Sequence, residues 1–113
     1  MRSARLLLAF ALGGAGCSSA FPPPGAAEIG AVKARDPEAR VENLEHGRAL
    51  YLGKCGGCHM LIEPGRFAAD VWPAKVERMQ GEARVHLAPD EARDLVRYLV
   101  GASAVAHGGR GAG

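Results

Sequence analysis

The feature that most constrains this chain of 113 residues is the pentapeptide Cys55-Gly56-Gly57-Cys58-His59. The pattern Cys-x-x-Cys-His is typical of covalent c-type haem attachment. Two cysteines three positions apart on a helical turn can reach both vinyl groups of one porphyrin. The next residue then presents its imidazole to the iron from the same side. The motif predicts one covalent haem c, attached through Cys55 and Cys58, with His59 as the proximal iron ligand.

Cys-x-x-Cys spacing also occurs in redox pairs and in zinc sites. A redox pair is expected beside a thioredoxin-like βαβ unit, and the sequence has no pattern for one. A structural zinc site needs four ligands, and the adjacent Cys58 and His59 cannot easily both point at one ion. Haem attachment is therefore the interpretation that the pattern favours.

The first residues of the chain have the features of an export signal. Arg2 and Arg5 precede a short apolar run and a group of small residues. That run is far shorter than the roughly 20 residues that span a bilayer. A lipoprotein-type signal over residues 1–16 would leave Cys17 as a lipidated N-terminus, whereas cleavage of residues 1–20 would remove Cys17. We expect an exported protein in the periplasm, either soluble or tethered to the outer or inner membrane by lipid.

Charge and size narrow the function further. Without Arg2 and Arg5, the 14 Lys and Arg residues fall to 12, which equals the number of Asp and Glu residues. A neutral chain without a basic stripe is not expected to bind nucleic acid.

Residues 17–37 are predicted to be a flexible Pro/Gly/Ala tether, and residues 102–113 a disordered Gly-rich tail.

The segment between them, residues 38–101, is predicted to be the globular domain. Its apolar periodicity is helical throughout, with helices expected over 38–52, 68–80 and 89–100. Pro89, followed by two acidic residues, begins the last helix, and Gly101 is expected to end it. A domain of this size seldom closes on its own core, so a bound haem would supply the missing interior. The predicted fold class is all-α.

Residues 41–100 resemble a class I monohaem cytochrome c. Gly47 and Tyr51 precede Cys55 at spacings of four, as in the N-terminal helix of that family, and Leu95 and Tyr98 match a pair on its C-terminal helix. The resemblance implies a small cytochrome c fold, with three main helices wrapped around one covalent haem. It also implies that the first and last helices cross at Gly47.

The distal iron ligand remains open at the level of sequence. Met79 ends the stretch Trp72-Pro-Ala-Lys-Val-Glu-Arg-Met79, which resembles a segment of short bacterial class I cytochromes and makes Met79 the candidate. His86, in the next loop, is the alternative, and Met79 would then only fill an apolar helix face. The resemblance further makes the carbonyl of Pro64 the candidate to hold the His59 ring, and the alternative is that Pro64 is an ordinary loop proline. Trp72 is expected either to cap a haem propionate or to lie in the core.

Iron that is held by an imidazole and a thioether has no open position for substrate. The sequence therefore predicts a one-electron carrier, not an enzyme, with no catalytic residues, that shuttles electrons between unidentified periplasmic or membrane redox partners. One alternative is an electron-accepting haem subunit of a periplasmic oxidoreductase. The other is a sensor with five-coordinate haem iron.

Overall fold

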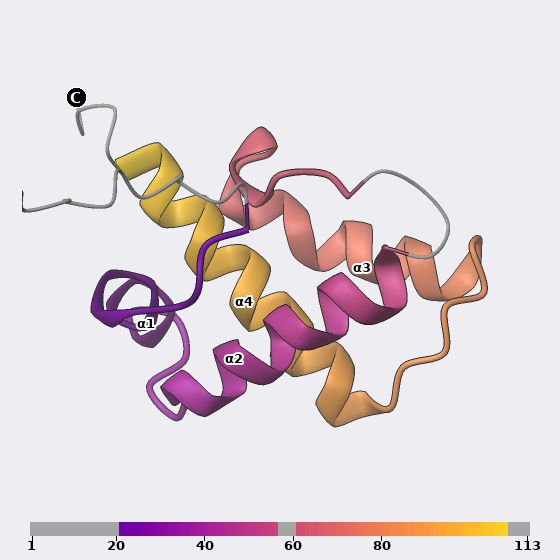
Figure 1. Ribbon diagram of the computed structural model, residues 1–113, viewed down its shortest axis with the longest axis horizontal. Coiled ribbons are helices and arrows are strands. Elements are labelled where there is room, and N and C mark those ends of the chain that lie inside the picture. Colours follow the sequence, from indigo (N-terminus) through magenta and orange to yellow (C-terminus); the bar gives the residue numbers. More distant parts are fainter. Residues whose placement is uncertain (1–20, 57–60, 109–113) are drawn as a thin grey trace, which may run out of the picture.

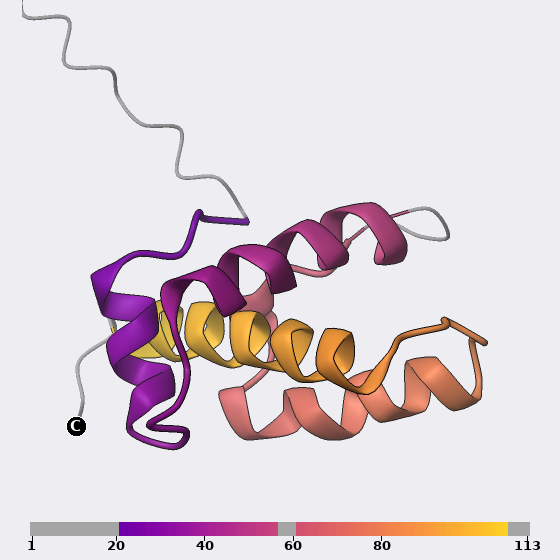
Figure 2. The ribbon, with the colours of Figure 1, turned by 90° about the horizontal axis from the view of Figure 1, so that it is seen from below.

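The computed structural model describes residues 21–56 and 61–108. The elements in chain order are α1 (Ala26–Lys33), α2 (Val41–Leu50), the π-helical turn η1 (Tyr51–Cys55), the 3₁₀ turns η2 (Pro64–Arg66) and η3 (Ala69–Val71), α3 (Trp72–Gly81) and α4 (Pro89–Gly108). Figures 1 and 2 show this arrangement. The part of the chain that is described contains no β-strand, which confirms the predicted all-α class.

The longest helix, α4, is the centre of the fold. Helices α1, α2 and α3 and the turn η2 all pack against it, and Figure 2 shows α4 between α2 and α3. Its inward stripe carries Leu95, Tyr98 and Leu99, each at most 1% exposed. These residues recur at helical spacing, so one face of α4 is buried. The expected core role of Leu95 and Tyr98 is confirmed.

Helices α2 and α4 cross (Figure 1), and Gly47 lies where their backbones come closest. A Cβ atom at this position would lie 2.0 Å from the carbonyl oxygen of Asp94 and 2.9 Å from Cβ of Tyr98. Only glycine allows the two backbones to approach so closely. The predicted contact of the first and last helices through Gly47 is confirmed.

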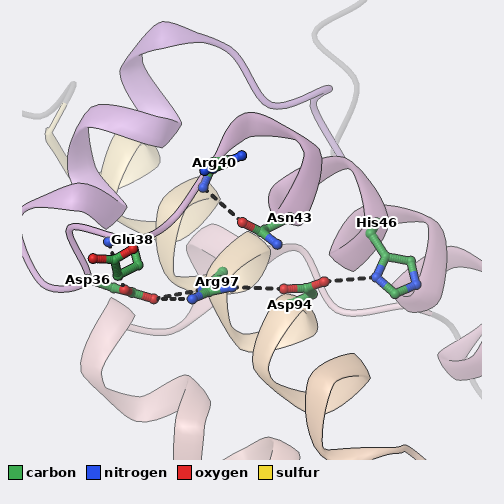
Figure 3. A network of polar contacts seen from close by, with 7 residues as sticks. All are labelled: Asp36, Glu38, Arg40, Asn43, His46, Asp94 and Arg97. Atoms are coloured by element: carbon green, nitrogen blue, oxygen red, sulfur yellow. Dashed lines mark hydrogen bonds and ion pairs between the residues drawn. The ribbon is translucent and has the colours of Figure 1, made fainter.

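A chain of polar contacts joins three parts of the fold beside this crossing (Figure 3). Arg97 of α4 donates to Asp36, in the link between α1 and α2, at 2.7 Å and to Asp94 at 3.0 Å. The other carboxylate oxygen of Asp94 lies 2.9 Å from Nδ1 of His46 on α2. Because Arg97 and Asp94 are nearly buried, their charges need these partners, and the network fixes the link and α2 relative to α4.

The structure corrects the flexible tether predicted for residues 17–37 over its described part. Helix α1 packs on α4, where Val32 is 2% exposed and lies 2.9 Å from the position of a Cβ at Gly101. Further upstream, the carbonyl groups of Phe21 and Pro22 accept hydrogen bonds from Arg48 and Tyr98. Too few apolar residues repeat in this segment to produce a helical pattern, so tertiary packing stabilises the helix instead.

The predicted tail also proves partly helical. Helix α4 continues through Gly101 to Gly108, and Ala102 and Ser103 are buried. The Ser103 hydroxyl donates to the carbonyl of Phe67 at 2.5 Å. A glycine inside a helix costs about 1 kcal/mol relative to alanine, and packing against α1 and η2 outweighs that cost here. Residues 109–113 lie outside the described part.

The remaining helices lie close to their predicted places. The helix expected over 38–52 begins at Val41, and its last turn is the π-helical η1. The helix expected over 68–80 begins at Trp72, so that Pro73 occupies its first turn, where a missing N–H costs no hydrogen bond. Among the residues that the structure describes, no helix has the length and apolarity needed to cross a membrane.

We predict that Gly47→Ala lowers the free energy of unfolding by about 2–3 kcal/mol, because the added methyl group would overlap the backbone of α4. Gly30→Ala in α1 is the matched control, since its Cβ would meet no described atom within 4 Å. Chemical denaturation of the holoprotein measures both variants. Equal stability of the two variants would contradict the close crossing.

Candidate functional site

A cavity of about 340 Å³ lies between η1 and α3. Its lining is contributed by η1, by the segment that follows the haem motif, by α3 and by the start of the next loop: Tyr51, Cys55, Leu61, Ile62, Trp72, Lys75, Arg78, Met79, Glu82 and Ala83. This volume falls in the range of small-molecule sites, which are roughly 300–1,000 Å³. The cavity is therefore the candidate site for the predicted haem.

Cys55 and Met79 line this cavity from different elements. Cys55 is the last residue of η1, and Met79 lies near the end of α3, where its side chain is half-buried. The two residues are 24 positions apart in the sequence, and the fold brings both to one cavity. The sulfur predicted to form a thioether and the candidate iron ligand thus line the same cavity.

His86 is placed differently. It lies exposed in the loop after α3 and does not belong to the cavity lining. Its backbone carbonyl accepts a hydrogen bond from Lys54 at 3.0 Å. Three other predicted site residues, Cys17, Cys58 and His59, lie outside the described residues, so their roles stay predictions.

The inner wall of the cavity is aromatic. The rings of Tyr51 and Trp72 meet edge to face with centroids 6.2 Å apart, and Phe67 packs edge-on against Trp72 at 5.6 Å. The indole N–H of Trp72 donates to the carbonyl of Pro64 at 2.8 Å. Because indole has a single donor, Trp72 has no N–H left for a propionate, and the structure gives it the core role.

The Tyr51 hydroxyl is held at the edge of the same cavity. It donates to the carbonyl of Ile62 at 2.5 Å, which connects η1 to the segment after the haem motif. Burial raises the pKa of Tyr51 to about 12, because the charged phenolate would lose its hydration. Burial also raises the pKa of Tyr98.

The described cavity wall carries two cationic side chains. Lys75 lies with Nζ 3.9 Å from the centroid of the Phe67 ring, a cation–π distance. Arg78, one turn along α3, pairs with Glu82 at 3.5 Å on the surface. These two cations were not predicted from the sequence. Their spacing from Met79 could have indicated them. Lys75 lies three positions before Arg78 and four before Met79, and residues three and four apart share a helix face.

The chemistry of this lining fits a haem. The residues around Cys55 and Met79 are mostly apolar or aromatic, as a porphyrin requires. Ile62 is 44% exposed at the cavity, so a bound macrocycle would cover apolar surface that otherwise faces water. Lys75 and Arg78 add positive charge of the sign that carboxylate propionates need.

Comparison with known families agrees with this site. The model of the family described as dihaem cytochrome c matches residues 51–111, which include the haem motif, α3 and α4. The chain belongs to the dihaem cytochrome c family. It is therefore a c-type cytochrome, in a family of haem-based electron-transfer proteins. No curated protein and no solved structure matches the chain significantly.

The raised pKa of Tyr51 predicts a loss of stability in alkali. A tyrosine titrates near pH 10 in the unfolded chain and at about 12 here, so its stabilising contribution is complete below about pH 10 and disappears as pH rises toward 12. Between about pH 9 and about pH 11.5, the free energy of unfolding of Tyr51→Phe should therefore fall less than that of the wild type, by about 1–2 kcal/mol. Denaturation curves at the two pH values measure this difference. Parallel losses would show that Tyr51 titrates normally.

Proposed function

We propose that this cytochrome is a one-electron carrier with a single haem c, attached through Cys55 and Cys58 and ligated by His59 and Met79. The observation that carries the proposal is the placement of Met79 and Cys55 on one apolar cavity, with His86 outside its lining. The family supports haem-based electron transfer, and the paired sulfurs of the motif supply the attachment.

The haem count follows from the cysteines. The chain contains three, and only Cys55 and Cys58 occur in a Cys-x-x-Cys-His pattern. Cys17 is alone in its part of the sequence and has no partner cysteine for a second pair of thioethers. We therefore infer one haem in this chain, although its family is described as dihaem.

The bound haem would supply an iron that cycles between Fe(III) and Fe(II). The thioether of Met79 is a soft ligand that favours the reduced state and raises the potential. The aromatic wall of Tyr51 and Trp72 would exclude water from the macrocycle, and Lys75 and Arg78 would hold its propionates. Because the cavity wall and the iron ligands would stay in place, little structural reorganisation would accompany a change in the charge of the iron. This suits electron transfer, in which no bond is made.

The ligand assignment is tested on the oxidised holoprotein. We expect a weak far-red band from the Met–Fe(III) bond, lost in Met79→Ala because the sulfur is removed. His86→Ala is the control and should keep the band. Reduced wild-type protein should bind carbon monoxide weakly, because the sixth position is filled.

Two results would contradict this assignment. Loss of the band in His86→Ala but not in Met79→Ala would make histidine the ligand. Rapid, tight binding of carbon monoxide by the wild type would indicate open iron and favour a sensor.

Stable co-purification with a larger oxidoreductase subunit would instead make the chain a subunit of that enzyme.

We also propose export to the periplasm with lipid on Cys17. Cys17 lies four positions before Phe21, whose carbonyl is bonded to Arg48 in the folded domain. Four extended residues span at most about 14 Å, so a lipid on Cys17 would hold the domain close to the membrane surface. Mass spectrometry of the mature N-terminus should find acyl chains on Cys17, and a mature chain that starts at Phe21 would contradict the proposal.

A further inference from the structure

Lys54 connects the haem-attachment turn to a distant loop. It directly precedes Cys55 in η1, and its ammonium group donates to the carbonyl of His86 at 3.0 Å. The same group lies 3.4 Å from Oε1 of Glu91 in the first turn of α4. One side chain thus joins η1, the loop between α3 and α4, and the start of α4.

The Glu91 carboxylate completes this connection from the other end of the loop. Its Oε1 accepts the backbone N–H of Ala88 at 2.9 Å, which caps the N-terminus of α4. The Ala88 N–H, followed by the ammonium group of Lys54, lowers the pKa of Glu91, because both stabilise the carboxylate. Glu91 is therefore ionised and can attract Lys54.

The loop that is held in this way, residues 82–88, begins three residues after Met79. The N–H of Val85 donates to the carbonyl of Met79 at 3.2 Å, so the chain folds back on the end of α3. Arg84 makes this reversal with φ of 55°, in the left-handed region that costs a non-glycine residue conformational energy. Glu82 and Ala83, where the loop starts, line the cavity.

We propose that Lys54 is a positioning residue that holds the loop 82–88 closed over the Met79 side of the haem cavity. The loop would otherwise relax from its strained turn, and Met79 would move with it. The proposal rests on the proposed function, because it treats Met79 as the iron ligand. It adds that a residue beside the attachment cysteine, and not in the cavity lining, controls access of small ligands to the iron.

The exposure of these groups sets the size of the effect. The side chains of Lys54 and Glu91 are 42% and 25% exposed, so their ion pair alone contributes little. The hydrogen bond from the charged Lys54 to the His86 carbonyl adds to it. Together they should shift the opening equilibrium of the loop about fivefold.

Two measurements on the holoprotein test the proposal. Imidazole should bind oxidised Lys54→Met about fivefold more tightly than wild type, because the loop opens more readily and Met79 is displaced more easily. In hydrogen–deuterium exchange, the Val85 amide should lose protection by the same factor. Lys54→Arg, which can still donate to both oxygens, should restore both values.

Lys33→Met in α1 is the matched control, since Lys33 is exposed and remote in sequence from this loop, and it should leave both values unchanged. Unchanged exchange at Val85 in Lys54→Met would overturn the proposal. Faster exchange with unchanged imidazole affinity would also overturn it, because the loop would then not control access. Wild-type protein that lacks the far-red band refutes the proposed Met79 ligation instead, and the exchange of Val85 still decides whether Lys54 holds the loop.

Discussion

The close crossing of α2 and α4 positions the aromatic cluster and the haem-attachment turn of this cytochrome. Gly47 allows the backbone of α2 to contact α4 at Asp94. This contact fixes the position of α2 along α4. One turn later Tyr51 enters the aromatic cluster, and one further turn places Cys55 on the cavity. The attachment turn is thus positioned by backbone contact, which is stiffer than a contact between long side chains.

The polar network beside the crossing supports the same geometry from the other side. Arg97 joins the link after α1 to α4, and Asp94 joins α4 to α2 through His46. Among the described residues no buried side-chain nitrogen or oxygen lacks a hydrogen-bond partner, so these charges are compensated within the fold. Tyr51 and Trp72 line the cavity, whose wall is largely apolar apart from Lys75, Arg78 and Glu82. Asp36, His46, Asp94 and Arg97 are all absent from the cavity lining, so this network is separate from the place where a haem would complete the interior.

Much of this organisation could be predicted from the sequence, because the strongest signals are short and local. The haem motif, the spacing of Gly47, Tyr51 and Cys55, and the start of α4 at Pro89 each depend on neighbouring residues. Met79 could be proposed as an iron ligand because the stretch from Trp72 to Met79 resembles a segment of short bacterial class I cytochromes. The structure places Met79 on the cavity, and its role as an iron ligand stays a prediction.

The parts that were missed depend on contacts between distant residues. The apolar residues of α1 show no amphipathic repeat, and the helix is held by tertiary contacts such as that of Val32 with Gly101, which are far apart in sequence. Gly101 was expected to end α4 because glycine weakens helices, yet here its missing side chain admits α1. Lys54 donates a hydrogen bond to the carbonyl of His86, and Trp72 donates one to the carbonyl of Pro64. Neither bond produces a periodic pattern in the sequence. Local propensity can be read from sequence, but the contact of α1 with Gly101 and single side-chain hydrogen bonds need the folded arrangement.

We propose that one haem is covalently bound through Cys55 and Cys58 and completes the core of this cytochrome. Extraction of the mature protein with acidified acetone tests it most directly, because this treatment removes haem that is held only by ligation and packing. We expect the pigment to stay with the precipitated polypeptide, at one haem per chain. Pigment that passes into the acetone, or a mature protein without colour, would contradict the account.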